Sequence, residues 1–131
     1  MIGLDTNVLI RYIMQDDVKQ SPLATRLVES LTMESPGFLP LVAVVEMAWV
    51  LSSAYELSRP QLIDAFEILL RTKELVVERG ETVWKSLRLL ASTGGDFADC
   101  LIACSANAAG CAKTMTFDRG AAKNGSMTLV S

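Results

Sequence analysis

Short apolar segments alternate with helical patterns along this chain, and this alternation constrains the fold more than any other feature of the sequence. Strands are expected at residues 1–4, 38–39, 75–78, 114–117 and 127–130. The segments between them place apolar residues at helical spacing, which predicts helices at 8–14, from 22 to about 31, 42–55, 58–72, 80–91 and 96–110. Short apolar strands separated by helices are typical of a parallel sheet covered on both sides. We therefore predict an α/β protein: one three-layer α/β/α domain over residues 1–131, with a central, mainly parallel sheet of four or five strands.

The chain contains no histidine. This excludes Ser-His-Asp and Cys-His nucleophile systems, histidine zinc ligands and imidazole acid–base chemistry. The three cysteines, Cys100, Cys104 and Cys111, lack Cys-x-x-Cys spacing and cannot all pair, so we expect buried free thiols in a reducing cytosol. An enzyme made from this chain must therefore use carboxylates, hydroxyls, lysines or a metal ion.

The charge and the hydropathy of the chain narrow its partners and location. A net charge of −3 argues against a generic basic nucleic-acid-binding protein. Asp5 interrupts the first apolar run, so the N-terminal segment does not resemble a signal peptide. The longest apolar stretch, residues 41–51, contains Glu46 and is far shorter than the ~20 residues that span a bilayer. We expect a soluble, cytoplasmic protein without a membrane segment.

Two aspartates directly follow expected strands. Asp5 comes after Met-Ile-Gly-Leu, and Asp118 comes after Thr-Met-Thr-Phe. Ligands bind in the crevice beyond the carboxyl ends of parallel strands, so two adjacent strands would place both carboxylates there. The alternative is that each aspartate only caps the helix that follows it.

Glu46 is the most informative single residue of the sequence. It lies in Leu-Val-Ala-Val-Val-Glu-Met-Ala-Trp-Val-Leu, where its neighbours are apolar on every helical face. This pattern predicts a helix buried nearly all round, and a buried glutamate needs a cation, strong donors or a water-filled pocket. The alternative is that Glu46 reaches solvent along one narrow face.

Asp96 and Asp99 lie three residues apart, so both belong to the first turn of the helix expected there. Asp96 could instead act only as the helix cap. Taken with Asp5, Glu46 and Asp118, these acids come from four separated segments. Carboxylate oxygens are the ligands that Mg²⁺ and Mn²⁺ prefer, and such ions suit phosphodiester hydrolysis.

The motifs around these acids resemble those of the PIN domain, and more closely its VapC-type toxin branch. Ile-Gly-Leu-Asp-Thr-Asn-Val-Leu-Ile at 2–10 is similar to the opening strand and turn of that family, and Val-Val-Glu-Met-Ala-Trp-Val-Leu at 44–51 to its glutamate helix. Asp-Phe-Ala-Asp-Cys-Leu-Ile-Ala at 96–103 and Thr-Phe-Asp-Arg at 116–119 resemble its third and fourth acidic motifs. The resemblance covers essentially the whole chain. It implies a PIN-like fold, RNA cleavage dependent on Mg²⁺ (with Mn²⁺ able to substitute), a homodimer, and inhibition by a cognate antitoxin protein.

The resemblance also implies roles for individual residues. The catalytic acids are Asp5, Glu46, Asp99 and Asp118. The metal would be held by all of these except Glu46, which would orient or deprotonate the attacking water. Accessory roles fall to Thr6, Asn7, Asp96 and Thr116. Apart from the resemblance, we consider Arg11, Arg119 and Lys123 as candidate phosphate contacts, each of which is otherwise a solvated surface charge.

One segment departs from the family pattern. Residues 120–123 read Gly-Ala-Ala-Lys, where the family commonly has another acid and an aromatic residue, so no second metal ligand is expected there. Trp49 and Trp84 are interpreted as bulk of the core or of a dimer interface rather than as base-stacking platforms.

Two other functions compete with a ribonuclease toxin. One is a non-catalytic PIN-fold module that binds RNA or protein. The other is an aspartyl-phosphate phosphatase of the haloacid-dehalogenase type. That chemistry requires a second aspartate two residues after the first, where this chain has Asn7.

Overall fold

Three short parallel strands form the sheet of the N-terminal part of the chain. The computed structural model describes residues 1–124 and 126–131, which form two units, Met1–Gly80 and Glu81–Ser131. In the N-terminal unit the strand order is β1-β2-β3, and both pairs are parallel. The strands are β1 (Ile2–Gly3), β2 (Gly37–Leu39) and β3 (Leu75–Val77).

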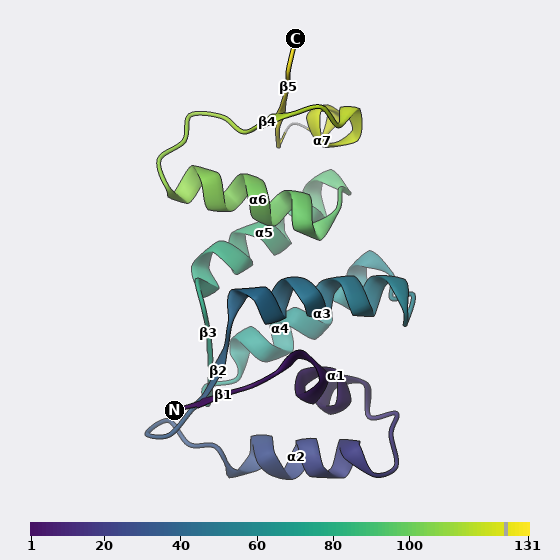
Figure 1. Ribbon diagram of the computed structural model, residues 1–131, viewed down its shortest axis with the longest axis vertical. Coiled ribbons are helices and arrows are strands. Elements are labelled where there is room, and N and C mark those ends of the chain that lie inside the picture. The colour runs from purple at the N-terminus through teal and green to yellow at the C-terminus, as the bar shows by residue number, and fades with distance from the viewer. Residues whose placement is uncertain (125) are drawn as a thin grey trace. The chain divides into compact units, whose positions relative to one another are not determined.

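Helices connect these strands, because a parallel pair cannot be joined by a tight turn. The connection from β1 to β2 contains α1 (Thr6–Met14) and α2 (Gln20–Ser30), and the connection from β2 to β3 contains α3 (Leu41–Ser53) and α4 (Arg59–Arg71). Helix α1 packs against α2 and α3, and α4 packs against β3 and α3 (Figure 1). A capping box between Ser58 and Gln61 begins α4.

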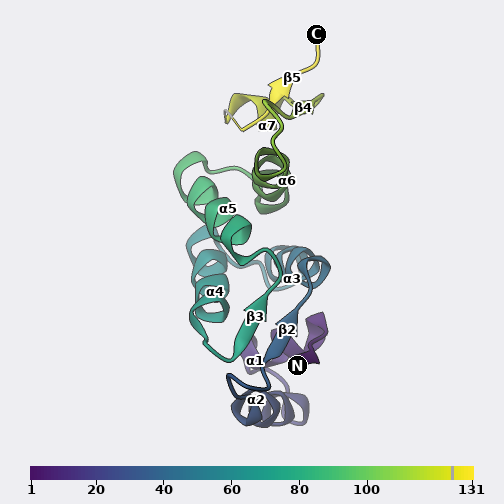
Figure 2. The same cartoon turned by 90° about the vertical axis from the view of Figure 1, so that its left-hand side faces the viewer.

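The C-terminal unit contains a second parallel strand pair. It consists of α5 (Gly80–Thr93), α6 (Phe97–Ala108), β4 (Met115–Thr116), α7 (Arg119–Lys123) and β5 (Thr128–Leu129). Strand β4 pairs with β5, and α7 connects them and packs on both (Figure 2). The chain leaves α6 through Gly110, whose φ of +95° lies in the region that favours glycine.

The core of the N-terminal unit lies among its sheet and helices. Its most deeply buried side chains include Leu9, Leu39, Met47, Leu51 and Phe66. At Gly37 a Cβ atom would come within about 3.0 Å of leucine side chains from three other segments, so a larger residue in β2 would require these leucines to shift.

The predicted strand segments and the α/β class agree with the structure, but the described strands form a three-stranded and a two-stranded sheet instead of one sheet of four or five strands. All five expected strand segments contain a strand, every described pairing is parallel, and helices separate the strands, which confirms the α/β fold class. One helix start was predicted wrongly. Helix α2 begins at Gln20 because the Asp17 carboxylate accepts hydrogen bonds from the backbone N–H groups of Lys19 and Gln20. Ser21, which directly precedes the expected start of the helix at residue 22, is instead buried inside its first turn.

Two further expectations concern the membrane and the cysteines. In the part of the chain that the structure describes, no helix is both long and apolar enough to cross a membrane. The three cysteines are free, as expected. Cys100 is buried, but Cys111 is exposed, so its predicted burial is wrong.

Candidate active site

Asp5 lies at the junction of β1 and α1. It is exposed and directly follows the buried Leu4. Its backbone is extended, and its Oδ1 accepts a hydrogen bond from the Thr6 backbone N–H at 2.8 Å. Asp5 is therefore the cap of α1, as the alternative interpretation expected. The cap uses only Oδ1, so Oδ2 remains available for another partner.

The Thr6 side chain connects the start of α1 to the middle of α3. Thr6 is buried, with 6% of its surface exposed, and its hydroxyl donates a hydrogen bond to Oε1 of Glu46. Asp5 follows β1, and α3 begins just after β2. Because β1 and β2 are parallel neighbours, both segments start at the same edge of the sheet. The fold thus brings together two carboxylates that are 41 residues apart in sequence.

Glu46 is exposed, so its predicted burial is wrong. One side of α3 packs into the core through Val44, Met47 and Leu51. The other side also carries apolar residues, and Trp49 there is 70% exposed. The apolar composition of α3 exceeds what its neighbours cover, so the prediction that the helix is buried all round fails. The interpretation of Trp49 as core fails for the same reason.

A hollow of about 460 Å³ lies over these acids in the N-terminal unit. Asp5, Thr6 and Glu46 line it together with Asn7 and Arg11, all of which the sequence had marked as candidates. Val50, Ile10 and Tyr55 complete the lining. Sequence reasoning missed Tyr55, since no spacing motif connects it with residues of α1.

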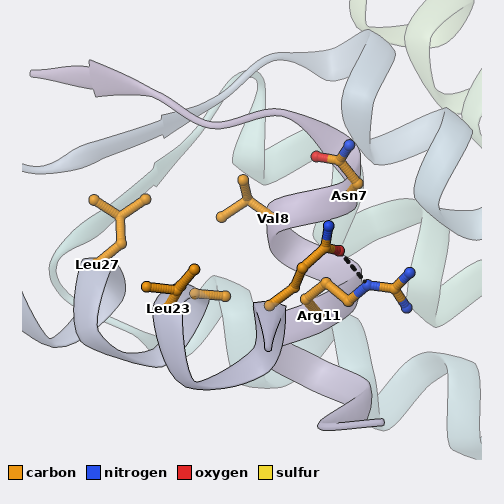
Figure 3. Close-up of a pocket in the computed structure, with 7 residues that line it drawn as sticks. Asn7, Val8, Arg11, Leu23 and Leu27 are labelled. Atoms are coloured by element: carbon orange, nitrogen blue, oxygen red, sulfur yellow. Dashed lines mark hydrogen bonds between the residues drawn. The ribbon is translucent and has the colours of Figure 1, made fainter. Parts of the chain in front are cut away.

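A second, more apolar hollow lies between α1 and α2. Asn7, Val8, Arg11, Leu23 and Leu27 line it, with Arg11 on its rim (Figure 3). Arg11 and Asn7 therefore border both hollows. Leu23 is 57% exposed, so its side chain borders the hollow from the surface.

The C-terminal unit gathers the remaining candidate acids. Asp99 lies in the first turn of α6 and is half-buried. Burial raises the pKa of Asp99, and the negative charges of Asp96 and Asp118 raise that pKa further. Asp96 and Asp118 therefore each lie close enough to Asp99 to repel its carboxylate electrostatically.

Asp96 and Asp118 differ in how they serve as helix caps. Asp118 accepts hydrogen bonds through Oδ1 from the backbone N–H groups of Gly120 at 2.7 Å and Ala121 at 3.3 Å. The Thr116 hydroxyl oxygen accepts a hydrogen bond from the Asp118 backbone N–H at 3.0 Å, which steadies this turn. Asp96 occupies the cap position of α6 without a side-chain cap bond. Its carboxylate is therefore not committed to the helix.

The two other basic candidates lie on the short helix that Asp118 caps. Arg119 and Lys123 are both exposed on α7. Because both side chains are exposed, their position fits a solvated surface charge as well as it fits a phosphate contact. Arg11, by contrast, lines a hollow together with the catalytic candidates Asp5 and Glu46.

The raised pKa of Asp99 gives a stability prediction with a definite sign. The folded chain binds the Asp99 proton more tightly than the unfolded chain, whose carboxyl has a pKa near 3.8. The contribution of Asp99 to stability is thus fully present below that pH and is lost as the pH rises through the folded pKa.

We expect Asp99→Asn to raise the midpoint of thermal unfolding at pH 7 in EDTA, and to lose this advantage below pH 3.8. Asp64→Asn, at an exposed position on α4, is the control. Equal midpoints of wild type and Asp99→Asn at pH 7 would contradict the electrostatic crowding.

The donor set of the site suits a hard divalent ion. It consists of carboxylates, hydroxyls and the Asn7 amide, all of which offer oxygen ligands. Neither unit, over its described residues, brings three Asp, Glu or Cys side chains together in a ready metal cage. Mg²⁺ does not need such a cage, because it keeps several waters and is commonly bound through one or two carboxylates.

A family model described as PIN domain matches residues 2–126 of the chain, a range that includes every candidate acid and most of each unit. No curated protein matches the sequence.

Proposed function

Because the chain belongs to the PIN-domain family, whose members are generally nucleases, we propose that it is a Mg²⁺- or Mn²⁺-dependent endoribonuclease of the VapC type. It would hydrolyse phosphodiester bonds of RNA in the cytoplasm, as the toxin of a type II toxin–antitoxin pair. The family match supports nuclease chemistry. The order and spacing of the four acidic motifs support the VapC assignment.

One observation carries the proposal: the Thr6 hydroxyl donates to Glu46 beside Asp5. The contact orients a glutamate from one connection of the sheet toward an aspartate from another. The bond engages Oε1 of Glu46 and leaves Oε2 for a water molecule. A purely structural role does not explain why both carboxylates face the same hollow.

We assign the residues the following roles. Asp5, Asp99 and Asp118 would hold the divalent ion directly or through water, and Asp96 would support them. Glu46 orients the attacking water and accepts its proton, while Thr6 fixes the Glu46 carboxylate. Asn7 and Thr116 supply further hydrogen bonds. The bound ion would supply charge neutralisation at the phosphate and a more acidic water.

Protein partners form the second half of the proposal. We expect a homodimer. We also expect an antitoxin that covers the hollow lined by Asp5, Thr6 and Glu46, called the acidic hollow below. The exposed apolar side chains of α3, Val42 and Trp49, support a surface for a protein partner. The molar mass measured by light scattering at high protein concentration tests the dimer. A mass of one chain at every concentration would exclude it.

Metal-dependent cleavage of total cellular RNA, with mapping of the new ends, tests the enzymatic function. We expect cleavage at defined sites with Mg²⁺ or Mn²⁺, its loss in EDTA, and its recovery when the ion is restored. RNA or protein binding without cleavage, together with weak Mn²⁺ binding by titration, would instead support the non-catalytic module.

A further inference from the structure

Arg11 is the cation of the acidic hollow. Among the residues described around this hollow, it alone carries a positive charge, whereas Asp5 and Glu46 are both acidic. A phosphate group that enters the hollow is repelled by these two carboxylates. Among the side chains that line the hollow, Arg11 is the one whose charge attracts a phosphate. Asn7, Ile10 and Arg11 lie at helical spacing on α1, which places Arg11 on the face of α1 that borders the hollow.

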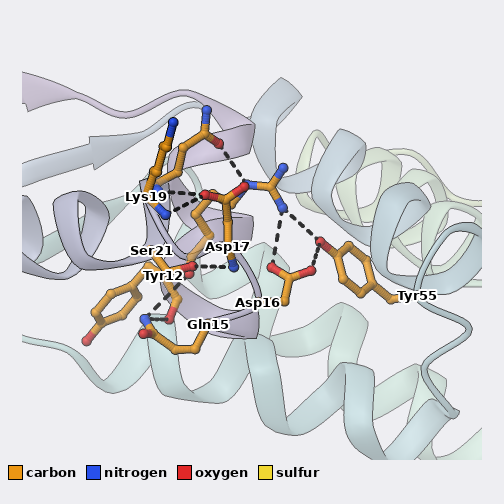
Figure 4. Close-up of polar contacts among 9 residues, drawn as sticks. Tyr12, Gln15, Asp16, Asp17, Lys19, Ser21 and Tyr55 are labelled. Carbon is orange, nitrogen blue, oxygen red and sulfur yellow. Dashed lines mark hydrogen bonds and ion pairs between the residues drawn. The ribbon is translucent and has the colours of Figure 1, made fainter.

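Three residues from outside α1 hold the Arg11 guanidinium. Its Nε donates to Oε1 of Gln20 at 2.8 Å, and its Nη1 donates both to Oδ1 of Asp16 at 3.3 Å and to the Tyr55 hydroxyl at 3.2 Å. The Tyr55 hydroxyl in turn donates to Oδ2 of Asp16 at 2.8 Å (Figure 4). Asp16 therefore uses both carboxylate oxygens, and the Tyr55 hydroxyl both donates and accepts.

This network fixes a side chain that otherwise has large conformational freedom. A single ion pair with Asp16 at a half-exposed position contributes little to holding the side chain in one conformation. Three partners, however, define both the position and the plane of the guanidinium. Because its rotamer is set in advance, less entropy is lost when Arg11 binds a ligand.

The network leaves one edge of the guanidinium for a ligand. Nη2 takes no part in the bonds to Asp16, Tyr55 and Gln20. The Arg11 side chain is 31% exposed and borders the hollow. A planar guanidinium with a free N–H edge is well suited to a phosphate oxygen.

We propose that Arg11 binds a backbone phosphate of the RNA strand in this hollow, and that Tyr55 and Asp16 are positioning residues that act through Arg11. This rests on the proposed ribonuclease function, since it names the part of the RNA that the site recognises. The contact is made to the backbone, so Arg11 contributes affinity and placement of the strand without selecting its bases.

The test compares RNA binding by wild type, Arg11→Ala and Arg26→Ala. Arg26 is exposed on α2 and outside the hollow, so Arg26→Ala removes the same charge elsewhere. A fluorescent single-stranded RNA is titrated in EDTA, without cleavage, across a series of salt concentrations. We expect Arg11→Ala to weaken binding about 10-fold or more, and to lower the slope of log affinity against log salt by about 0.7, as loss of one phosphate contact requires. Arg26→Ala should leave both unchanged.

A second comparison tests the role of Tyr55. Tyr55→Phe keeps the ring and removes the hydroxyl, and we expect it to weaken binding about threefold in wild type. In the Arg11→Ala background it should have no further effect, because Tyr55 acts only through Arg11. Arg11→Lys should restore the salt slope but only part of the affinity. An equal effect of Tyr55→Phe in both backgrounds would show that Tyr55 contacts RNA itself.

The outcomes separate this inference from the proposed function. If wild type cleaves RNA with Mg²⁺ but Arg11→Ala binds RNA like Arg26→Ala, the inference fails and the function stands. If no cleavage occurs under any metal condition but the salt slopes differ as expected, the ribonuclease function fails and the phosphate contact stands. Inorganic phosphate and unlabelled RNA are also compared as competitors of the fluorescent RNA at equal phosphate concentration. If the two compete equally well, Arg11 binds free phosphate, and the proposal that it recognises the RNA strand is wrong. Thermal unfolding of each variant verifies that it is folded.

Discussion

Asp5→Asn is expected to lower the rate of metal-dependent RNA cleavage by about a thousandfold while the protein remains folded. Asparagine has nearly the same shape as aspartate and is an equally good helix cap, so the bond from the Thr6 N–H to the side-chain oxygen survives. It lacks the negative charge that a divalent ion requires from its ligand. Single-turnover cleavage of a mapped RNA site, at saturating Mg²⁺, measures the rate.

Two further variants separate the charge of Asp5 from its capping role. Asp5→Ala removes both, and should add a loss of about 1 kcal/mol in the free energy of unfolding. Asp64→Asn removes an exposed carboxylate on α4 and should cleave at the wild-type rate. Wild-type cleavage by Asp5→Asn would exclude Asp5 from the metal site, whatever its position in the hollow.

Phe66→Ala is expected to lower the free energy of unfolding by about 3–5 kcal/mol. Phe66 lies on α4 with 1% of its surface exposed, and it is the largest of the fully buried side chains. Truncation to alanine loses the transfer energy of the ring and leaves a cavity in a close-packed core. Because whole domains are stable by only about 5–15 kcal/mol, this is a large fraction of the total. Equilibrium denaturation in urea measures the change.

Ile68→Ala, two residues further along the same helix, is the control. Ile68 is 53% exposed, so its truncation should change the free energy of unfolding by less than about 1 kcal/mol. Phe66→Leu retains most of the buried volume and should cost less than about 1.5 kcal/mol, which keeps the comparison measurable if Phe66→Ala does not fold. Similar losses for Phe66→Ala and Ile68→Ala would contradict the burial of Phe66.

The strands and helices were predictable because their signals are local. Helical apolar spacing acts over one or two turns of chain, and the helices at 58–72 and 96–110 were expected from it. In the structure Ser58 caps the first of these, and Gly110 follows the end of the second. The start of α2 was predicted wrongly, because two residues competed for the same role. Asp17 accepts hydrogen bonds from the backbone N–H groups of Lys19 and Gln20, and the helix therefore begins ahead of Ser21.

The exposure of Glu46 shows what an apolar composition cannot predict. The apolar sequence of a helix indicates that its burial is favourable, but it does not indicate which of its faces other elements cover. In α3 the core side is filled, while Val42, Trp49 and Glu46 itself remain exposed. The inference that Glu46 needs a partner was nevertheless useful, because Thr6 supplies one.

The sequence by itself determined the α/β class, the order of its elements and the acids worth testing, since these depend on local periodicity and on residue chemistry. Only the tertiary structure decided which side chains meet. It placed Thr6 against Glu46, and it joined Arg11 to Asp16 and Tyr55, contacts that span up to 44 residues of chain. Such contacts depend on how parallel strands and their crossover helices pack in space, and spacing along the chain carries no record of that geometry.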